Sequence, residues 1–228
     1  GQRIGLVGKE GGSGGWSHLH FDIKCRQPSG KWGTQNGYAF IWQAYQQQYS
    51  PDIIAVARPH HLVYTGETVQ LDASKSWCRR GKIDKYEWTL CDGTKATGSN
   101  IKRVYERAGE YSEIVKVTDS DGNFAYDFAV VYVIDRKHPE RVPPAIHANY
   151  YPTFGLRAGD EVAFKVRSFG TQHGREVWDF GDGSDPVKVR SDGNANQHNP
   201  AGYAMTRHRY GKAGDYIVTV RRSDENGY

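Results

Sequence analysis

Hydrophobic and polar residues alternate along several short segments of this chain, and one segment follows a different period. Alternation is clearest at residues 68–74, 114–117, 161–167 and 217–220. A period of two places every second side chain on the same face, which predicts half-buried β-strands. Residues 38–49 instead carry apolar side chains at the i, i+3, i+4, i+7 spacing of an amphipathic helix, namely Tyr38, Ile41, Trp42, Tyr45 and Tyr49. We expect this helix to pack against other elements; sugar binding by its aromatic stripe is the alternative.

Beyond residue 53 the chain contains an internal repeat. Trp88 and the following Asp92-Gly93 correspond to Trp178 and Asp182-Gly183. Further along, the segment Ala-Gly-Glu-Tyr at 108–111 corresponds to Ala-Gly-Asp-Tyr at 213–216. Each copy therefore places a Trp on a strand that ends in an Asp-Gly turn, and a Tyr at the start of a later strand.

The second copy's Trp-Asp-Phe-Gly-Asp-Gly-Ser, residues 178–184, closely resembles the hallmark segment of PKD (polycystic kidney disease) domains. The first copy departs from it at Thr89, Leu90 and Cys91. A buried Trp and a tyrosine corner are features of immunoglobulin-like sandwiches. The resemblance implies an all-β chain with two tandem immunoglobulin-like (PKD) β-sandwiches. Such domains are usually spacers or adhesion modules of secreted enzymes and surface proteins.

A different signal precedes the repeat: a glycine-rich turn at 11–15 leads into His18-Leu19-His20. On a strand, His18 and His20 share one face, which suits a metal site. A catalytic zinc normally has about three protein ligands and one water, so these two residues cannot complete a site. The alternative for so short a motif is an ordinary pair of strand histidines.

Residues 1–8 and 16–23 closely resemble the end of the catalytic core of lysostaphin/LytM-type zinc endopeptidases. Those secreted enzymes cut peptide cross-links in bacterial cell walls or other glycine-rich peptides. The resemblance implies a catalytic role for His18 and zinc ligation by His20. The family's other ligands come from a His-x-x-x-Asp motif well upstream, and none of the histidines downstream of His20 has an Asp four residues later. Three interpretations stay open: a fragment of a longer enzyme, a site completed by an upstream chain or domain, or a relic without activity.

These signals divide the chain into four parts. Residues 1–52 comprise the end of a partial zinc-peptidase core, with a short β segment and the helix, and residues 53–136 form the first PKD-like domain. Residues 137–145 are a proline-rich linker expected to be a semi-rigid spacer, and residues 146–228 form the second PKD-like domain. The first copy continues into a last strand at 124–134 that has no counterpart in the second. Because an unpaired edge would be exposed, we expect the chain either to be truncated at this end or to take a strand from elsewhere. About 15 extra residues within 188–205 predict a long loop or small hairpin in that domain.

Amino-acid composition and charge limit the classes of function expected for this chain. The 228 residues include 15 Tyr, 6 Trp and 27 Gly, which favour strands and tight turns. The formal net charge of +4 is spread over interspersed Lys, Arg, Asp and Glu, so we predict no nucleic-acid partner. No apolar run reaches the ~18 residues of a membrane span. We expect a secreted or cell-surface bacterial protein that contacts a cell-wall peptide or polysaccharide surface.

Several side chains remain as candidates for metal or redox chemistry. Turn carboxylates that could join a calcium ion are Asp92, Asp119, Asp121, Asp182 and Asp224. Hydrogen bonding of each carboxylate to its local backbone is the favoured alternative. We interpret His198 and His208 as surface residues of a loop and a strand. Cys25, Cys78 and Cys91 are too few for a disulfide framework, and free thiols are favoured over one pair plus one thiol.

Two functions are consistent with the sequence. In the first, the chain is the C-terminal part of a secreted zinc metalloendopeptidase, with the PKD pair as a substrate-positioning or spacer module. In the second, it is a non-catalytic extracellular binding, adhesion or carbohydrate-contacting module that retains a peptidase remnant. An upstream His-x-x-x-Asp motif would distinguish the two.

Overall fold

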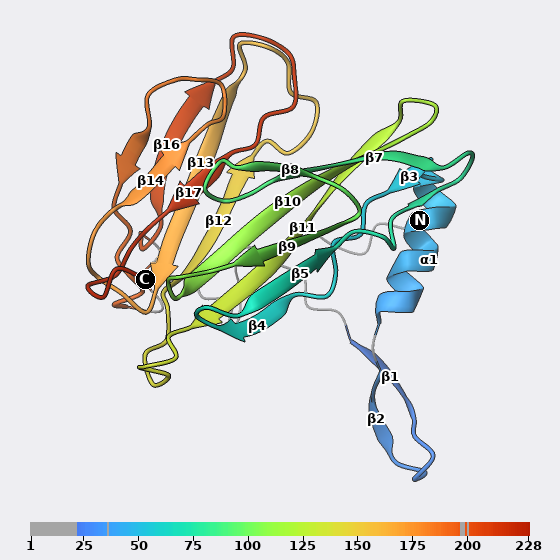
Figure 1. The fold of residues 1–228 in the computed structure, drawn as a ribbon, viewed down its shortest axis with the longest axis horizontal. Coiled ribbons are helices and arrows are strands. Elements are labelled where there is room, and N and C mark those ends of the chain that lie inside the picture. The colour runs from blue at the N-terminus through green and yellow to red at the C-terminus, as the bar shows by residue number, and fades with distance from the viewer. Residues whose placement is uncertain (1–21, 36, 197–198, 200) are drawn as a thin grey trace.

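The computed structural model describes residues 22–228 except 36, 197–198 and 200 (Figure 1). The described chain begins with an antiparallel hairpin of β1 (Ile23–Arg26) and β2 (Trp32–Gln35), followed by α1 (Tyr38–Tyr49). The helix has the predicted bounds. It ends where Ser50 adopts a left-handed conformation and its N–H donates to the Gln46 carbonyl at 2.9 Å.

The aromatic stripe of α1 is exposed rather than packed against the described strands. The rings form a ladder along the helix, with centroid separations of 6.0 Å for Tyr38–Trp42, 5.8 Å for Trp42–Tyr45 and 5.1 Å for Tyr45–Tyr49. Tyr38, Tyr45 and Tyr49 are all more than a third exposed. The predicted packing role is therefore not seen within the described part of the chain, where the rings contact one another.

The first sandwich follows. One layer is a five-stranded sheet of order β4-β11-β10-β7-β8, and the strands opposite it pair as β5-β9 and β3-β6. The bounds are β3 (Ile53–Ile54), β4 (His61–Tyr64), β5 (Thr68–Asp72), β6 (Trp77–Cys78), β7 (Ile83–Thr89), β8 (Lys95–Thr97), β9 (Asn100–Val104), β10 (Gly109–Asp119) and β11 (Phe124–Ile134). Only β4 runs parallel to its neighbour, β11.

The core of the first sandwich lies between these layers. Trp88 on β7 is 1% exposed, and its indole N–H donates to the Gly98 carbonyl at 2.9 Å. Leu71 on β5 faces it from the opposite layer and is fully buried. β11 contributes Ala129, Val131 and Val133, each 0% exposed, while its intervening residues face outward. The period-two pattern of the sequence is therefore the pattern of burial.

The second sandwich is smaller and consists of two three-stranded sheets of order β12-β13-β16 and β15-β14-β17. The bounds are β12 (Ala145–Tyr151), β13 (Glu161–Phe169), β14 (Glu176–Asp179), β15 (Val187–Val189), β16 (Ala204–Arg209) and β17 (Thr219–Arg221). Trp178 on β14, Phe164 on β13 and the adjacent Phe180 form its aromatic centre. The described residues between β15 and β16 contain no strand, as a loop would require, and Asp192 among them forms an ion pair with Arg167 at 2.8 Å.

Both copies contain the predicted tyrosine corner. The hydroxyl of Tyr111 donates to the Arg107 carbonyl at 2.8 Å, and that of Tyr216 donates to the Lys212 carbonyl at 2.8 Å. In each case the acceptor lies four residues upstream, as expected for this feature of immunoglobulin-like folds. The all-β class and the two tandem sandwiches predicted from sequence are thus confirmed.

The two sandwiches lie side by side, with the second next to β10 and β11 of the first (Figure 1). Between them, Pro143 and Pro144 are buried, and the Tyr132 hydroxyl donates to the Pro143 carbonyl at 3.4 Å. Arg221 donates to the Cys91 carbonyl at 2.5 Å, and the hydroxyl of Tyr228 donates to Asp135. The proline end of the linker therefore contacts the first domain at Tyr132, and its role as a semi-rigid spacer stays a prediction. None of the described helices is long and apolar enough to cross a membrane.

Candidate binding surface

The predicted zinc residues His18 and His20 lie outside the described residues, so the structure gives no geometry for them. Among the residues that the structure does describe, no group of three or more His, Cys, Asp or Glu side chains is arranged to hold a metal ion. The zinc site stays a prediction from sequence, tied to the resemblance of the first 23 residues.

The five turn aspartates are spread over both domains, and four of them accept hydrogen bonds from their own turns. Asp92 accepts the Thr94 N–H at 2.9 Å, and Asp182 accepts the Ser184 N–H at 3.1 Å. Asp224 accepts the Tyr228 N–H at 2.8 Å. Gly93 and Gly183 have φ of +88° and +84°, which explains why each Asp is followed by Gly in these turns.

The turn at the end of β10 places two of these aspartates near one small polar cavity. Asp119 accepts the N–H groups of Asp121 and Asn123 and the Asn123 side-chain amide, all within 3.0 Å. The Asn123 side chain and then the backbone donors lower the pKa of Asp119. Asp52 and Arg80 complete the lining of the cavity, whose volume is about 230 Å³. Because the Asp119 oxygens already accept three hydrogen bonds, the turn interpretation explains them without an ion; calcium stays an untested prediction.

His208 is not the surface residue expected from sequence. Its side chain is 15% exposed and stacks on Phe180 with a centroid separation of 4.1 Å. Its Nε2 lies 2.7 Å from Asp182 Oδ2. The sequence signal was weak because β16 alternates half-buried and exposed residues, and the half-buried face of a strand next to an aromatic core readily accommodates a histidine. His198 lies outside the described residues.

A row of aromatic side chains, Phe124, Tyr126 and Phe128, follows the outer face of β11 and is called here the aromatic row. The three side chains are 45%, 42% and 44% exposed. Residues two apart on a strand are about 6.6–6.8 Å apart, so the three rings extend over about 13 Å. Two cationic side chains lie over rings of the aromatic row: Lys116 Nζ is 4.1 Å from the ring centroid of Phe124, and Arg58 Cζ is 5.7 Å from the ring centroid of Phe128. The sequence contains this signal, since every second residue of 124–128 is aromatic, but their outward orientation depends on the register of β11.

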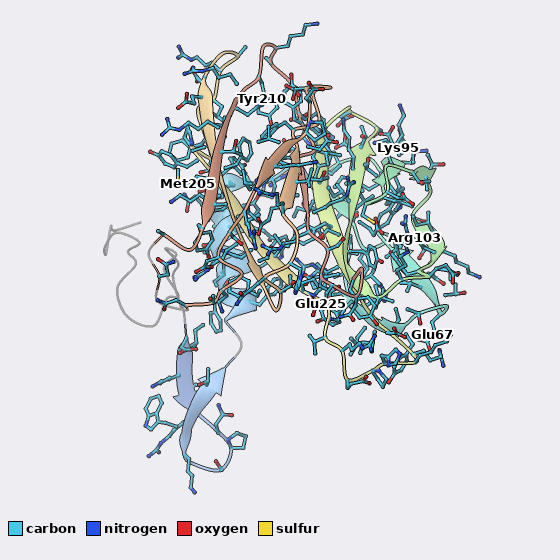
Figure 2. The ribbon with its side chains drawn as sticks, turned by 90° about the vertical axis from the view of Figure 1, so that its left-hand side faces the viewer. Glu67, Lys95, Arg103, Met205, Tyr210 and Glu225 are labelled. Atoms are coloured by element: carbon cyan, nitrogen blue, oxygen red, sulfur yellow. The ribbon has the colours of Figure 1, made fainter. Side chains whose placement is uncertain are left out.

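A large groove lies between the two sandwiches, where the inner end of the aromatic row meets the second domain. Its volume is about 780 Å³. Tyr126 and Phe128 line it from the first domain, and Trp178, Val218 and Val220 line it from the second. Figure 2 shows Tyr210, another lining residue, at one end of the second domain. The groove could not be predicted from sequence, because it depends on how the domains pack.

Comparison with known proteins identifies the repeated unit. Residues 50–133 and residues 147–228 each match a family model described as PKD domain. The chain contains two tandem PKD domains. The resemblance that rested on Trp178–Ser184 and on the internal repeat is therefore confirmed, including for the first copy with its departures at Thr89, Leu90 and Cys91.

The relatives of these PKD domains include two bacterial collagenases. Collagenase ColA of Clostridium perfringens (strain 13 / Type A) is 29% identical over 86 residues, which cover 38% of this chain and 8% of the relative. Microbial collagenase of Vibrio alginolyticus is 26% identical over 110 residues, or 44% of this chain and 13% of the relative. The chain thus spans only a small part of the length of either.

Among solved structures, the PKD1 domain from Vibrio cholerae metalloprotease PrtV is 23% identical, with a TM-score of 0.29. That match covers 36% of this chain and 93% of the other.

Proposed function

We propose that these residues are the PKD part of a secreted bacterial peptidase, and that the PKD pair positions the enzyme on a polymeric substrate through the aromatic row. The observation that carries the proposal is the row itself: three exposed rings on one face of β11, with Lys116 of β10 and Arg58 over two of them. The collagenases among the relatives support the peptidase context. The substrate we infer is a cell-wall peptide or polysaccharide surface.

The physical argument is that these rings are exposed without being needed for the core. β11 buries its other face, so its outer side chains contribute little to folding beyond contacts with their neighbours. Exposed aromatic rings offer large apolar area with little loss of conformational freedom on binding. Lys116 and Arg58 add charge that attracts anionic wall polymers. A regular polymer can contact successive rings of a row, whereas a small solute contacts one.

The test is co-sedimentation of the full chain with insoluble peptidoglycan, with collagen fibres and with chitin. We expect Phe124→Ser to reduce the bound fraction on at least one of these polymers several-fold. The matched control is Phe154→Ser, since Phe154 is an exposed phenylalanine of the second domain, 84% exposed and outside the row. Equal loss from both variants, or no binding to any polymer, would contradict the proposal.

The peptidase half of the proposal concerns His18 and His20. We propose a LytM-type core in which His20 helps to hold zinc and His18 acts in catalysis, with the remaining ligands supplied by an upstream segment or chain. Zinc would activate the water that attacks the peptide carbonyl. Intact mass and zinc content of the natively produced protein test this on one sample. About one zinc per chain, lost in His20→Ala, supports it; a mass matching residues 1–228 with no zinc leaves the non-catalytic binding module instead.

A further inference from the structure

The outer face of the β12-β13-β16 sheet, called here the basic face, carries an excess of positive charge. On β13 the buried Val162, Phe164 and Val166 face the core, so the intervening residues face outward. The strand register then defines the members of the basic face: Asn149 and Tyr151 of β12, Glu161, Ala163 and Lys165 of β13, and Met205, Arg207 and Arg209 of β16. Among these described residues, Glu161 is the single carboxylate opposite one lysine and two arginines.

The cations of the basic face are accessible and only partly neutralised. The side chains of Arg207 and Arg209 are 65% and 61% exposed. Both donate to the same carboxylate, that of Glu161, and Arg209 does so at 2.9 Å. Lys165 forms no ion pair with any residue that the structure describes. Because one carboxylate is shared among these cations, the face attracts a ligand that brings acidic groups of its own.

A small floor lies between an aromatic ring and a guanidinium on this face. Ala163 pairs with Tyr151 on one side and with Arg207 on the other. Neighbouring strands are about 4.7–4.9 Å apart, so the backbones of Tyr151 and Arg207 lie on opposite sides of the Ala163 methyl group at about 9–10 Å. Tyr151 is 75% exposed. The ring of Tyr151 can contact the apolar C–H face of a sugar, while the Arg207 guanidinium can bind a carboxylate on the same sugar.

We propose that the basic face binds a carboxylate-bearing polysaccharide, with one sugar ring over Ala163 against Tyr151 and its carboxylate on Arg207. Lys165 and Arg209 lie one outward position before and after Arg207, about 6.6–6.8 Å along the strands, and contact the acidic groups of the adjoining sugars. Figure 2 shows Met205 of the basic face on the side of the second domain away from the first. The inference therefore adds a second binding surface to the aromatic row of the first domain.

The chemistry of the basic face favours a polysaccharide over other acidic polymers. A single-stranded nucleic acid is held by a series of aromatic rings on which successive bases stack, and among its described residues the face has one ring, Tyr151. An acidic peptide would have to order flexible side chains on a flat surface, which costs conformational entropy, whereas a sugar ring is already rigid.

The test measures binding of the full chain to an oligogalacturonate by calorimetry. The matched control ligand is the methyl ester of the same oligosaccharide, which keeps the sugar rings and removes the charge. We expect the acid to bind, the ester to bind at least about tenfold more weakly, or about 1.4 kcal/mol, and added salt to weaken binding of the acid. No binding of the acid, or equal binding of acid and ester, would overturn the proposal.

Variants of the chain locate the site. Lys165→Gln and Arg207→Gln should each weaken binding of the oligogalacturonate several-fold, and the double variant at least about tenfold. Glu161→Gln should act in the opposite direction and tighten binding about threefold, because it releases Arg207 and Arg209 from their shared carboxylate. Lys188→Gln is the control, since Lys188 is an exposed lysine on the other sheet of the same domain. Thermal unfolding checks that each variant is folded.

Three results would count against the basic face as a polysaccharide site. Equal weakening by Lys188→Gln would show that the total charge of the chain matters and not this face. Tighter binding in Arg207→Gln than in the unmodified chain would exclude the carboxylate contact. Binding of single-stranded DNA or of a glutamate oligomer at least as tightly as the oligogalacturonate, and lost in Arg207→Gln, would make that polymer the ligand instead.

This inference and the proposed function fail separately. Phe124 belongs to the first domain, so Phe124→Ser should leave binding of the oligogalacturonate unchanged. Arg207→Gln should leave co-sedimentation with chitin unchanged, because chitin is an uncharged polymer.

Discussion

Arg222 donates to Glu176 at 2.5 Å in the interior of the second domain, and both side chains are fully buried. Burial by itself would raise the pKa of Glu176, but hydrogen bonds from the Ser191 and Ser168 side chains and from the Ser191 N–H hold it below the usual value. The first domain has a related arrangement, in which the buried Glu113 accepts from Tyr105 and from the Cys91 N–H. Each sandwich therefore contains a fully buried glutamate held by several donors.

Removing one member of the Glu176–Arg222 pair should be costly. We expect Glu176→Ala and Arg222→Ala each to lower the free energy of unfolding by about 3–5 kcal/mol, because each leaves an uncompensated buried charge. The double variant should lose less than the sum of the two. Urea unfolding measures the free energy of unfolding of the two single variants and of the double variant. The control is Arg209→Ala, which breaks an exposed pair with Glu161 at 2.9 Å and should cost less than about 1 kcal/mol. Similar losses in buried and exposed pairs would contradict the assignment.

The tyrosine corner of the first domain should contribute a single hydrogen bond. Tyr111→Phe removes only the hydroxyl that donates to Arg107, so we expect a loss of about 0.5–1.5 kcal/mol. Tyr151→Phe is the matched control, since Tyr151 is 75% exposed. Thermal or urea unfolding gives the comparison. A larger effect of the control would show that the corner is not the stabilising contact.

Asp182 should remain ionised to unusually low pH. The hydroxyl of Ser184, followed by the contact with His208, lowers its pKa from 3.8 to about 2. A carboxylate with a lowered folded pKa stabilises the fold above the unfolded value, and that contribution is lost as the pH falls from about 4 towards 2. NMR titration of the Asp182 carboxyl carbon measures this. We expect Ser184→Ala to raise the pKa more than His208→Phe does, while His208→Phe keeps an aromatic ring against Phe180. An unchanged titration in both variants would contradict this.

Local sequence patterns predicted most of the scaffold because they depend on neighbours along the chain. The helix at 38–49 follows from apolar spacing, and the positions of Trp88 and Trp178 follow from the Asp-Gly turns after them. These features needed no knowledge of how distant segments meet.

Other features depend on contacts that no local pattern contains. His208 is half-buried because Phe180 and Asp182 come from a different strand and turn. The groove exists because Tyr126 and Phe128 of one domain face Val218 and Val220 of the other. The exposed ladder on α1 also differs from expectation: an apolar stripe predicts a helix and its face, but not what covers that face.

The cysteines provide a last test that joins burial to reactivity. All three are free in the structure, as favoured from the sequence. Burial, and next the nearby Glu113 carboxylate, raise the pKa of the Cys91 thiol to about 12. The thiolate is the reactive form, so at pH 8 very little of Cys91 is available to an alkylating reagent. We expect intact mass spectrometry to find three free thiols, and iodoacetamide to label Cys91 much more slowly in the native chain than in urea. Fast native labelling would mean that the Glu113 region opens readily. A disulfide between any two of the cysteines would contradict the free-thiol assignment outright.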